Sequence, residues 1–418
     1  MYGSPSEGPE PVRIGVLGCA DIARRRVLPA FAADPGSRVA AVASRDGGRA
    51  REMADRFDCA AVTGYDRLLA DPAVEAVYVP LPVALHADWI ERALRAGKHV
   101  LGEKPLTGDV DSTRRLFELA AARGLVLAEN FMFPRHPLHR RVRELVTGGA
   151  IGELRSFTGE FAIPAPPPGD VRYDAALGGG ALLDIAVNPL LAARFFLGPA
   201  LTVCGARLRR HPVHGVDTGG AVLLAAPDGV TAQVVFGMEH AYRAGYELWG
   251  SAGRIRVERA YAPPADHCPV IRVERPEGAE ELVLHPADQY LEAVRAFSHA
   301  VRQTRRTEPA GQTRRTEPAG QTRRTEPAGQ PRRTEPAGRA EQAGPAQQTR
   351  PTRQTRPNTR QTRQTRGGPG AERSLRERHQ ERALTVARLV AEVRAADKAA
   401  SSAAQHPVPS WDDPRGAL

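Results

Sequence analysis

The chain has 418 residues, enough for two globular domains, and its 41% of apolar residues can build their cores. Its longest apolar runs are far short of the roughly 20 residues of a membrane span, and its polar, proline-rich start shows no secretory signal. The four cysteines lie far apart in sequence, without metal-ligand spacing. We therefore expect a cytoplasmic protein without a membrane segment or a bound metal.

The formal net charge of +10 comes from one segment. Residues 303–370 hold 15 arginines against five glutamates, so the other 350 residues are neutral. The nine residues 303–311 recur at 312–320 and 321–329, and with one change at 330–338. With almost no large apolar residue, this insert is expected to be disordered. It is either an arginine-rich arm that binds RNA or an acidic partner, or a tolerated duplication in a surface loop, and its lack of aromatic residues favours the duplication.

Strands and helices alternate along the first part of the chain. We predict strands at 12–17, 39–43, 76–80, 99–101 and 125–128, and helices at 22–33, 48–57 and 84–96. This alternation predicts an α/β domain with a doubly wound parallel sheet of the Rossmann type. We assign it to residues 12–130, after a disordered tail over 1–11.

From about Phe131 the pattern changes to long alternating runs. We predict a helix at 137–147 and strands at 153–162, 201–209, 220–224, 230–238 and 254–257. They indicate an α+β domain with a large, mostly antiparallel sheet, over residues 131–302 and 371–396. Helices at 289–301 and 373–394 are expected to be neighbours in this domain, separated by the insert, and 397–418 to be a second disordered tail.

The turn after the first strand has a partial dinucleotide-binding pattern. Gly18, Ala20 and Ala23 occupy the three glycine positions of the template, and only the first is glycine. The turn follows a strand and opens a helix whose N-terminal N–H groups suit a pyrophosphate, although a plain turn without ligand is the alternative. Ser44-Arg45 ends the second strand, where an arginine suits the 2′-phosphate of NADP better than the 2′-hydroxyl of NAD. A chance arginine is the alternative, because the chain has 55 of them.

Lys104 follows a predicted strand in Glu103-Lys104-Pro105. Only three of the 58 basic residues are lysine, and a desolvated lysine, unlike arginine, can release a proton near neutral pH. Lys104 is therefore a candidate proton donor, with an ordinary surface lysine as the alternative. His86 opens a predicted helix at the same edge of the sheet, where it either contacts a cofactor or only caps the helix.

Together these motifs resemble the Gfo/Idh/MocA family of oxidoreductases. The likeness rests on the turn at 15–23, Pro82 to His86, Gly97 to Val100 and Glu103-Lys104-Pro105. Segments 129–133, 178–184 and 237–242 are similar to the sugar-nucleotide 3-ketoreductases of deoxysugar biosynthesis. The resemblance covers about residues 12–302 and resumes near 372.

The resemblance implies NADPH-dependent reduction of the C-3 ketone of a nucleotide-linked, dTDP-type keto-deoxysugar, in a homodimer or homotetramer. It implies catalysis by Lys104, Asp184 and Asn188, with substrate at Lys104, Asn130 and Asn188. The residues expected to hold NADP(H), in preference to NAD(H), are Gly15, Gly18, Cys19, Ala20, Asp21, Ile22, Ser44, Arg45, Tyr65, Leu81, His86, Glu103, Lys104, Arg172 and Asp184.

Asn188 departs from the family, which usually has tyrosine or histidine four residues after the aspartate. Asparagine can form hydrogen bonds but cannot give up a proton. Either Lys104 supplies the proton alone, or the protein is an impaired or non-catalytic NADP-binding member; another sugar or polyol dehydrogenase activity is a further alternative. A nucleic-acid-binding protein that uses the insert is disfavoured, because the rest of the chain is neutral.

Overall fold

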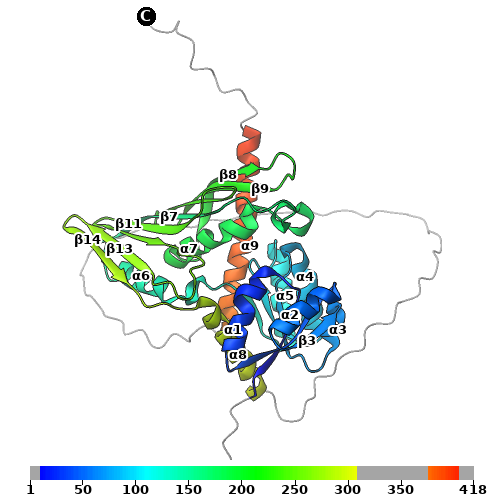
Figure 1. Cartoon of the computed structure of the whole chain (residues 1–418). Helices are drawn as coiled ribbons and strands as arrows, with labels where there is room; N and C mark the ends of the chain where they lie inside the picture. The colour runs from blue at the N-terminus through cyan, green and yellow to red at the C-terminus, as the bar shows by residue number, and fades with distance from the viewer. Residues whose placement is uncertain (1–9, 308–374, 404–418) are drawn as a thin grey trace, which may run out of the picture. The chain divides into compact units, whose positions relative to one another are not determined.

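The computed structural model describes residues 10–307 and 375–403 (Figure 1). Most of the insert, and the expected tails except for 10–11 and 397–403, lie outside these residues. The described part of the chain contains two sheets (Figure 1).

The first sheet has six parallel strands in the order β3-β2-β1-β4-β5-β6. This confirms the predicted doubly wound sheet. The sequence did not reveal β3, because it is a four-residue edge strand whose side chains are largely exposed. The strands are β1 (Val12–Leu17), β2 (Ser37–Ser44), β3 (Ala60–Thr63), β4 (Ala76–Val79), β5 (His99–Glu103) and β6 (Leu127–Asn130).

Helices cover both faces of this sheet. The π-helical η1 (Ala23–Val27), α1 (Leu28–Ala33) and α2 (Gly47–Arg56) contribute apolar side chains to the core on one face. The core on the other face includes side chains from α3 (Tyr65–Ala70), α4 (His86–Arg95) and α5 (Val110–Ala122). The helix expected at 22–33 is thus interrupted by a π-helical turn, and α3 and α5 were not anticipated.

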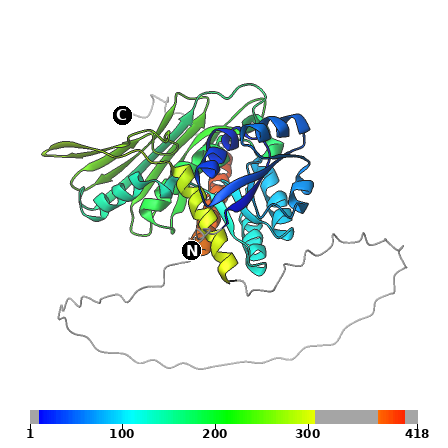
Figure 2. The same cartoon turned by 60° about the horizontal axis from the view of Figure 1, so that its bottom comes forward.

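Helix α8 (Gln289–Thr307) belongs to the first sheet, which corrects its expected place in the second domain. Val294, Phe297 and Val301 are buried in one core with Val12 and Ile14 of β1. Figure 2 shows α8, in yellow, beside the blue elements of that sheet. The chain therefore returns to its first domain after completing the second sheet.

The second sheet has eight strands in the order β14-β13-β12-β11-β7-β10-β9-β8. Only β7 and β10 pair in parallel, so the predicted mostly antiparallel sheet is confirmed. Three of its strands, β11, β13 and β14, were not predicted. The strands are β7 (Leu154–Ile163), β8 (Thr202–Arg210), β9 (Asp217–Ala225), β10 (Thr231–Met238), β11 (Arg243–Gly250), β12 (Arg254–Glu258), β13 (Val270–Arg275) and β14 (Gly278–Val283).

Helices α6 (Pro137–Thr147) and α7 (Val187–Leu197) pack into the core of the second sheet. The stretch Ala175–Leu197, which contains α7, is the one part of the described chain long and apolar enough to span a membrane. Its most apolar window is 72% buried inside the protein. It therefore serves here as a core helix.

Helix α9 (Leu375–Ala403) contacts both sheets. Its first turns lie against α5 and β6, and the rest lies against α7 and β8 (Figure 1). The expected second tail begins inside this helix, because the buried Asp397 accepts a hydrogen bond from Leu208 N of β8 at 2.8 Å.

The insert likewise begins later than expected, because residues 303–307 complete α8. Arg305 of the first repeat forms an ion pair with Glu75 and donates a hydrogen bond to Glu10 O. The helical turn therefore has a partner on the first sheet.

Candidate active site

The turn after β1 brings its main chain close to the loop of Leu81. Gly18 has φ +114°, a conformation that favours glycine, and its N–H donates to Ala43 O at 2.9 Å. A Cβ atom there would lie 3.0 Å from Leu81 Cδ2. The helix begins at Asp21, after Cys19 and Ala20, so its first N–H groups face this turn.

Asp21 and Ile22 occupy the first helical turn. Asp21 forms ion pairs with Arg24, at 2.7 Å, and with Arg25. These two cations compensate the charge of the carboxylate at the helix start. Gly15, by contrast, lies inside β1, where a Cβ would meet Leu68 Cδ2 at 2.6 Å. It packs there against α3.

The end of β2 offers a hydroxyl and an exposed cation beside this turn. Ser44 is buried and its Oγ accepts the Asp46 N–H at 3.1 Å, whereas Arg45 is exposed. Burial raises the pKa of Tyr65, and the nearby charge of Arg45 opposes this shift. Ser44, Arg45 and Tyr65 therefore gather with Gly18 at one edge of the sheet.

His86 connects two loops at this edge instead of reaching into open space. Its buried ring lies between two main-chain carbonyls, with Nε2 2.7 Å from Leu81 O and Nδ1 3.1 Å from Pro105 O. Burial lowers the pKa of His86, although both carbonyls favour the protonated ring. His86 thereby joins the loop of Leu81 to the loop of Lys104.

Glu103, at the end of β5, has a buried carboxylate that accepts hydrogen bonds from both neighbouring strands. Tyr78 Oη of β4 and Asn130 Nδ2 of β6 each donate to Oε1 at 2.6 Å, and Lys104 N donates to Oε2 at 3.2 Å. Tyr78 was not expected in the site. Tyr78 lies in an apolar predicted strand, so nothing in the sequence marks its phenol as a partner of Glu103. Its side chain is fully buried.

Lys104 lies where the first domain meets the second. Its Nζ donates to Asp184 O at 2.8 Å and to Asp184 Oδ1 at 2.7 Å. Arg172 Nε donates to the other carboxylate oxygen, Oδ2, at 2.7 Å. The side chains of Lys104 and Asp184 are 17% and 33% exposed. An ammonium has three N–H donors, so one remains without a partner in the described part of the chain.

Asp184 is held in its charged form by these two cations. Its burial works to raise the pKa, but the charges of Lys104 and Arg172 outweigh that effect and hold the pKa well below its usual range. Asp184 therefore cannot deliver a proton near neutral pH. It orients the Lys104 ammonium.

Asp184 itself is positioned by a glycine-rich loop. It lies on the π-helical turn η6 (Leu182–Ala186), whose Leu182 N–H donates to Asp217 Oδ2 at 2.5 Å. Gly180 has φ +115°, and a Cβ there would lie 2.6 Å from Asp217 Oδ1. Asp217 was not anticipated, since nothing near it in the sequence marks it as a partner of this turn.

Asn188 uses its amide group within its own helix. Nδ2 donates to Asp184 O at 3.3 Å and Ile185 O at 3.2 Å, which leaves the acceptor Oδ1 without a partner in the residues that the structure describes. An acceptor of this kind suits a sugar hydroxyl rather than a ketone.

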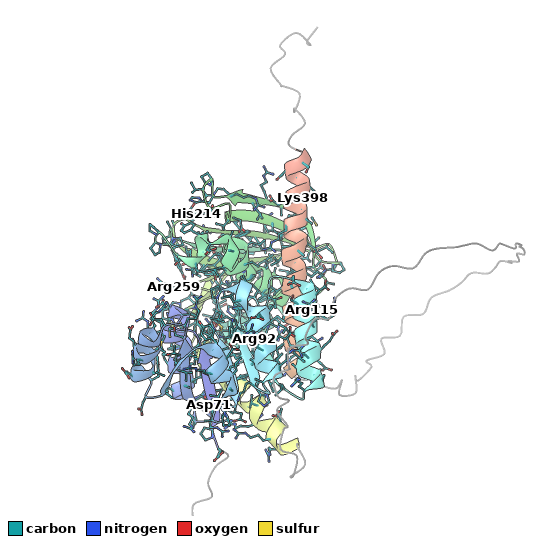
Figure 3. The ribbon with its side chains drawn as sticks, turned by 90° about the vertical axis from the view of Figure 1, so that its right-hand side faces the viewer. Asp71, Arg92, Arg115, His214, Arg259 and Lys398 are labelled. Carbon is teal, nitrogen blue, oxygen red and sulfur yellow. The ribbon has the colours of Figure 1, made fainter. Side chains whose placement is uncertain are left out.

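The other two lysines have different surroundings. Lys98 is buried and donates to Asp71 O and Val74 O, both at 2.7 Å. Lys398 lies on α9, and Figure 3 labels it far from Asp71, the residue that Lys98 contacts. Lys104 alone combines partial burial, a paired carboxylate and a free N–H donor.

Two family patterns match this chain. That of the oxidoreductase family with an NAD-binding Rossmann fold matches residues 12–131, and that of the GFO/IDH/MocA C-terminal domain matches residues 139–256. The chain belongs to the Gfo/Idh/MocA family. It is thus an oxidoreductase by family, as its motifs indicated.

Several relatives of this Gfo/Idh/MocA protein share one activity in their names. A dTDP-3,4-didehydro-2,6-dideoxy-alpha-D-glucose 3-reductase of Streptomyces violaceoruber is 57% identical over 72% of this chain and 89% of the relative. One of the same name from Actinomadura kijaniata is 54% identical over 70% of this chain and 88% of the relative. The crystal structure of an Actinomadura kijaniata 3-ketoreductase with NADP and TDP-benzene has a TM-score of 0.70 and 53% identity, covering 71% of this chain and 91% of that one.

Proposed function

We propose that this protein reduces the C-3 ketone of a dTDP-linked keto-deoxysugar with NADPH. The observation that carries the proposal is the Lys104 ammonium, oriented by Asp184 and left with one free N–H donor at the carboxyl edge of the first sheet. The named activity of the 57% identical relative supports the choice of substrate.

The residues at this edge fit a dinucleotide with a 2′-phosphate. The free N–H groups at the helix start after Gly18 suit a pyrophosphate, and the exposed Arg45 beside Ser44 supplies a cation. We place NADP(H) against Cys19 to Ile22, Ser44, Arg45, Tyr65 and Leu81, with Glu103 and Arg172 nearer the substrate end. When bound, NADPH supplies a hydride from its nicotinamide C4.

Lys104 supplies the proton in this proposal. As negative charge develops on the C-3 oxygen, the free N–H of its ammonium stabilises and then protonates that oxygen. Asp184 and Arg172 hold the ammonium in place, and Asn188 Oδ1 accepts from a sugar hydroxyl. No phenol is required at position 188.

The test is turnover of a defined substrate. Purified protein would be incubated with NADPH and dTDP-3,4-didehydro-2,6-dideoxyglucose, with NADPH consumption followed optically and the product identified by NMR. We expect stoichiometric NADPH oxidation and a new hydroxyl at C-3. NADPH binding without turnover would instead identify a non-catalytic member, in line with the departure at Asn188, and reduction at C-4 would refute the regiochemistry.

A further inference from the structure

The turn that carries Lys104 is held at three main-chain atoms. Lys104 N donates to Glu103 Oε2 at 3.2 Å, and Pro105 O lies 3.1 Å from the His86 ring. Leu106 N donates to Glu129 Oε1 at 3.0 Å. The first two contacts come from residues already placed in the site. The third comes from a carboxylate that the chemistry does not use.

Glu129 contacts this turn from one face of the first sheet, whereas Glu103 and Asn130 lie on the other face. Side chains alternate along a strand, so adjacent Glu129 and Asn130 of β6 point to opposite faces. Asn130 fixes Glu103, and Glu129 fixes Leu106. The turn is therefore supported from both faces of the sheet.

Glu129 is paired with an arginine of α9, beyond the insert in sequence. Arg382 Nε lies 3.5 Å from Glu129 Oε2, with the two side chains 11% and 0% exposed. Arg382 Nη2 also donates to Glu129 O at 3.4 Å, and the guanidinium lies over the Phe131 ring at 5.5 Å. Burial raises the pKa of Glu129, and the charge of Arg382 opposes that shift. The carboxylate thus depends on Arg382 for compensation.

Arg382 is in turn fixed by its own helix. Its Nη2 lies 2.7 Å from His379 Nδ1, one turn earlier on α9. Burial, together with the charge of Arg382, lowers the pKa of His379 well below its usual range, so its ring accepts this hydrogen bond as the neutral form. A continuous set of contacts therefore leads from α9 to the residue two positions after Lys104.

We propose that Glu129 and Arg382 are positioning residues for Lys104, which makes α9 a functional part of the active site. The proposal rests on the proposed role of Lys104 as proton donor. Without Arg382, the buried Glu129 carboxylate loses its compensating charge and either takes up a proton or turns away from Leu106 N. Lys104 then shifts relative to the ketone, and a displacement of about 1 Å costs about 100-fold in rate.

The test compares Arg382→Lys and Arg382→Met with Asp397→Asn as a matched control. Asp397 is also a buried carboxylate with a main-chain N–H and an arginine as partners, Leu208 N and Arg210, but it lies 15 residues further along α9. That separation is about 22 Å of helix. All three variants disturb a buried charge on this helix, and only two of them disturb the contact with the Lys104 turn.

We expect Arg382→Met to lower kcat about 10- to 100-fold and Arg382→Lys about 3- to 10-fold. The Kd for NADPH should change less than about twofold, because the residues proposed to bind its phosphates, Cys19 to Ile22 with Ser44 and Arg45, follow β1 and β2. Asp397→Asn should lower the Tm while leaving kcat within about twofold. If Arg382→Met fails to fold, Arg382→Lys decides. Unchanged kcat in a folded Arg382→Lys variant, or an equal loss in Asp397→Asn, would overturn the proposal.

A second measurement does not require turnover. The chain has only three lysines, so lysine labelled with ¹⁵N at Nζ gives three side-chain signals, and Lys104→Arg identifies the one from Lys104. We expect that signal to shift or broaden in the Arg382 variants and to be unchanged in Asp397→Asn. If the wild type has no ketoreductase activity, the proposed function fails while this measurement still tests the positioning. An unmoved Lys104 signal in both Arg382 variants would refute it.

Discussion

Replacing Lys104 with arginine keeps the positive charge at this position but removes the ability of the side chain to release a proton. The guanidinium keeps a positive charge next to Asp184, and charge-assisted hydrogen bonds of this kind contribute about 1.5–3 kcal/mol. The Asp184 carboxylate, which Arg172 also contacts at 2.7 Å, therefore remains paired. Folding and cofactor binding should survive the change.

Catalytic turnover, by contrast, should be almost completely lost in Lys104→Arg. Arginine has a pKa above about 12 and does not release its proton. Loss of general acid catalysis lowers the rate by about 10²–10⁴, which corresponds to about 2.7–5.4 kcal/mol in activation free energy. Because the guanidinium stays paired with Asp184, ground-state pairing changes by less than this, so the loss should fall on kcat rather than on KM.

The assay is steady-state NADPH oxidation at saturating keto sugar, with the NADPH Kd and the Tm measured on the same preparation. We expect both of these to be close to wild type, with kcat reduced at least about 100-fold. Lys104→Met should be as slow or slower, because it also leaves Asp184 with Arg172 alone. A Lys104→Arg variant with kcat within about threefold of wild type would refute Lys104 as the proton donor.

Three further predictions concern the cofactor, position 188 and the insert. Arg45→Asp should weaken NADPH binding about 10- to 100-fold and bring NADH level with it or ahead, by fluorescence titration; equal affinity of the wild type for both would contradict this. Asn188→Tyr should raise kcat about tenfold or less if a second proton donor helps, whereas a lower kcat/KM would show that the ring collides with substrate. Deleting 312–366 should leave the Tm nearly unchanged, whereas Arg305→Ala, which removes the ion pair with Glu75, should cost about 1 kcal/mol or less in a denaturation experiment.

The parallel sheet could be predicted because its central strands are buried on both faces and form continuous apolar runs. All four residues of β4, Ala76–Val79, are buried. The edge strand β3 has the opposite character, with Ala60, Ala61 and Thr63 exposed, so no apolar run marks it. Buried central strands are visible in a sequence, and exposed edge strands are not.

The placement of α8 shows a second limit. Its pattern of Val294, Phe297 and Val301 reveals an apolar face but not the surface that covers it. Adjacency in sequence suggested the second sheet, and the structure places the helix on the first. Amphipathic periodicity specifies that a partner exists without identifying it.

The residues of the candidate active site also differ in how far the sequence alone could identify them. Lys104 could be selected from residue chemistry, because a lysine is unusual in a chain so rich in arginine. Asp184 came from the family resemblance, since it lies 80 residues further along the chain on a π-helical turn with no local signal. The contact between Arg382 and Glu129 spans 253 residues, and only the folded structure brings these two together.

The position of α8 affects how the protein is made. Val12, Ile14 and Tyr78 emerge early from the ribosome, yet the helix that covers them begins at Gln289. At about 5–20 residues per second, synthesis of the intervening second domain takes roughly 8–30 s. For that interval the part of this apolar core that α8 covers stays exposed on the nascent first domain, the kind of surface that chaperones bind and that drives aggregation. A fragment ending at residue 131 would lack α8 permanently, so we expect the dinucleotide-binding domain not to be obtainable in soluble form without that helix.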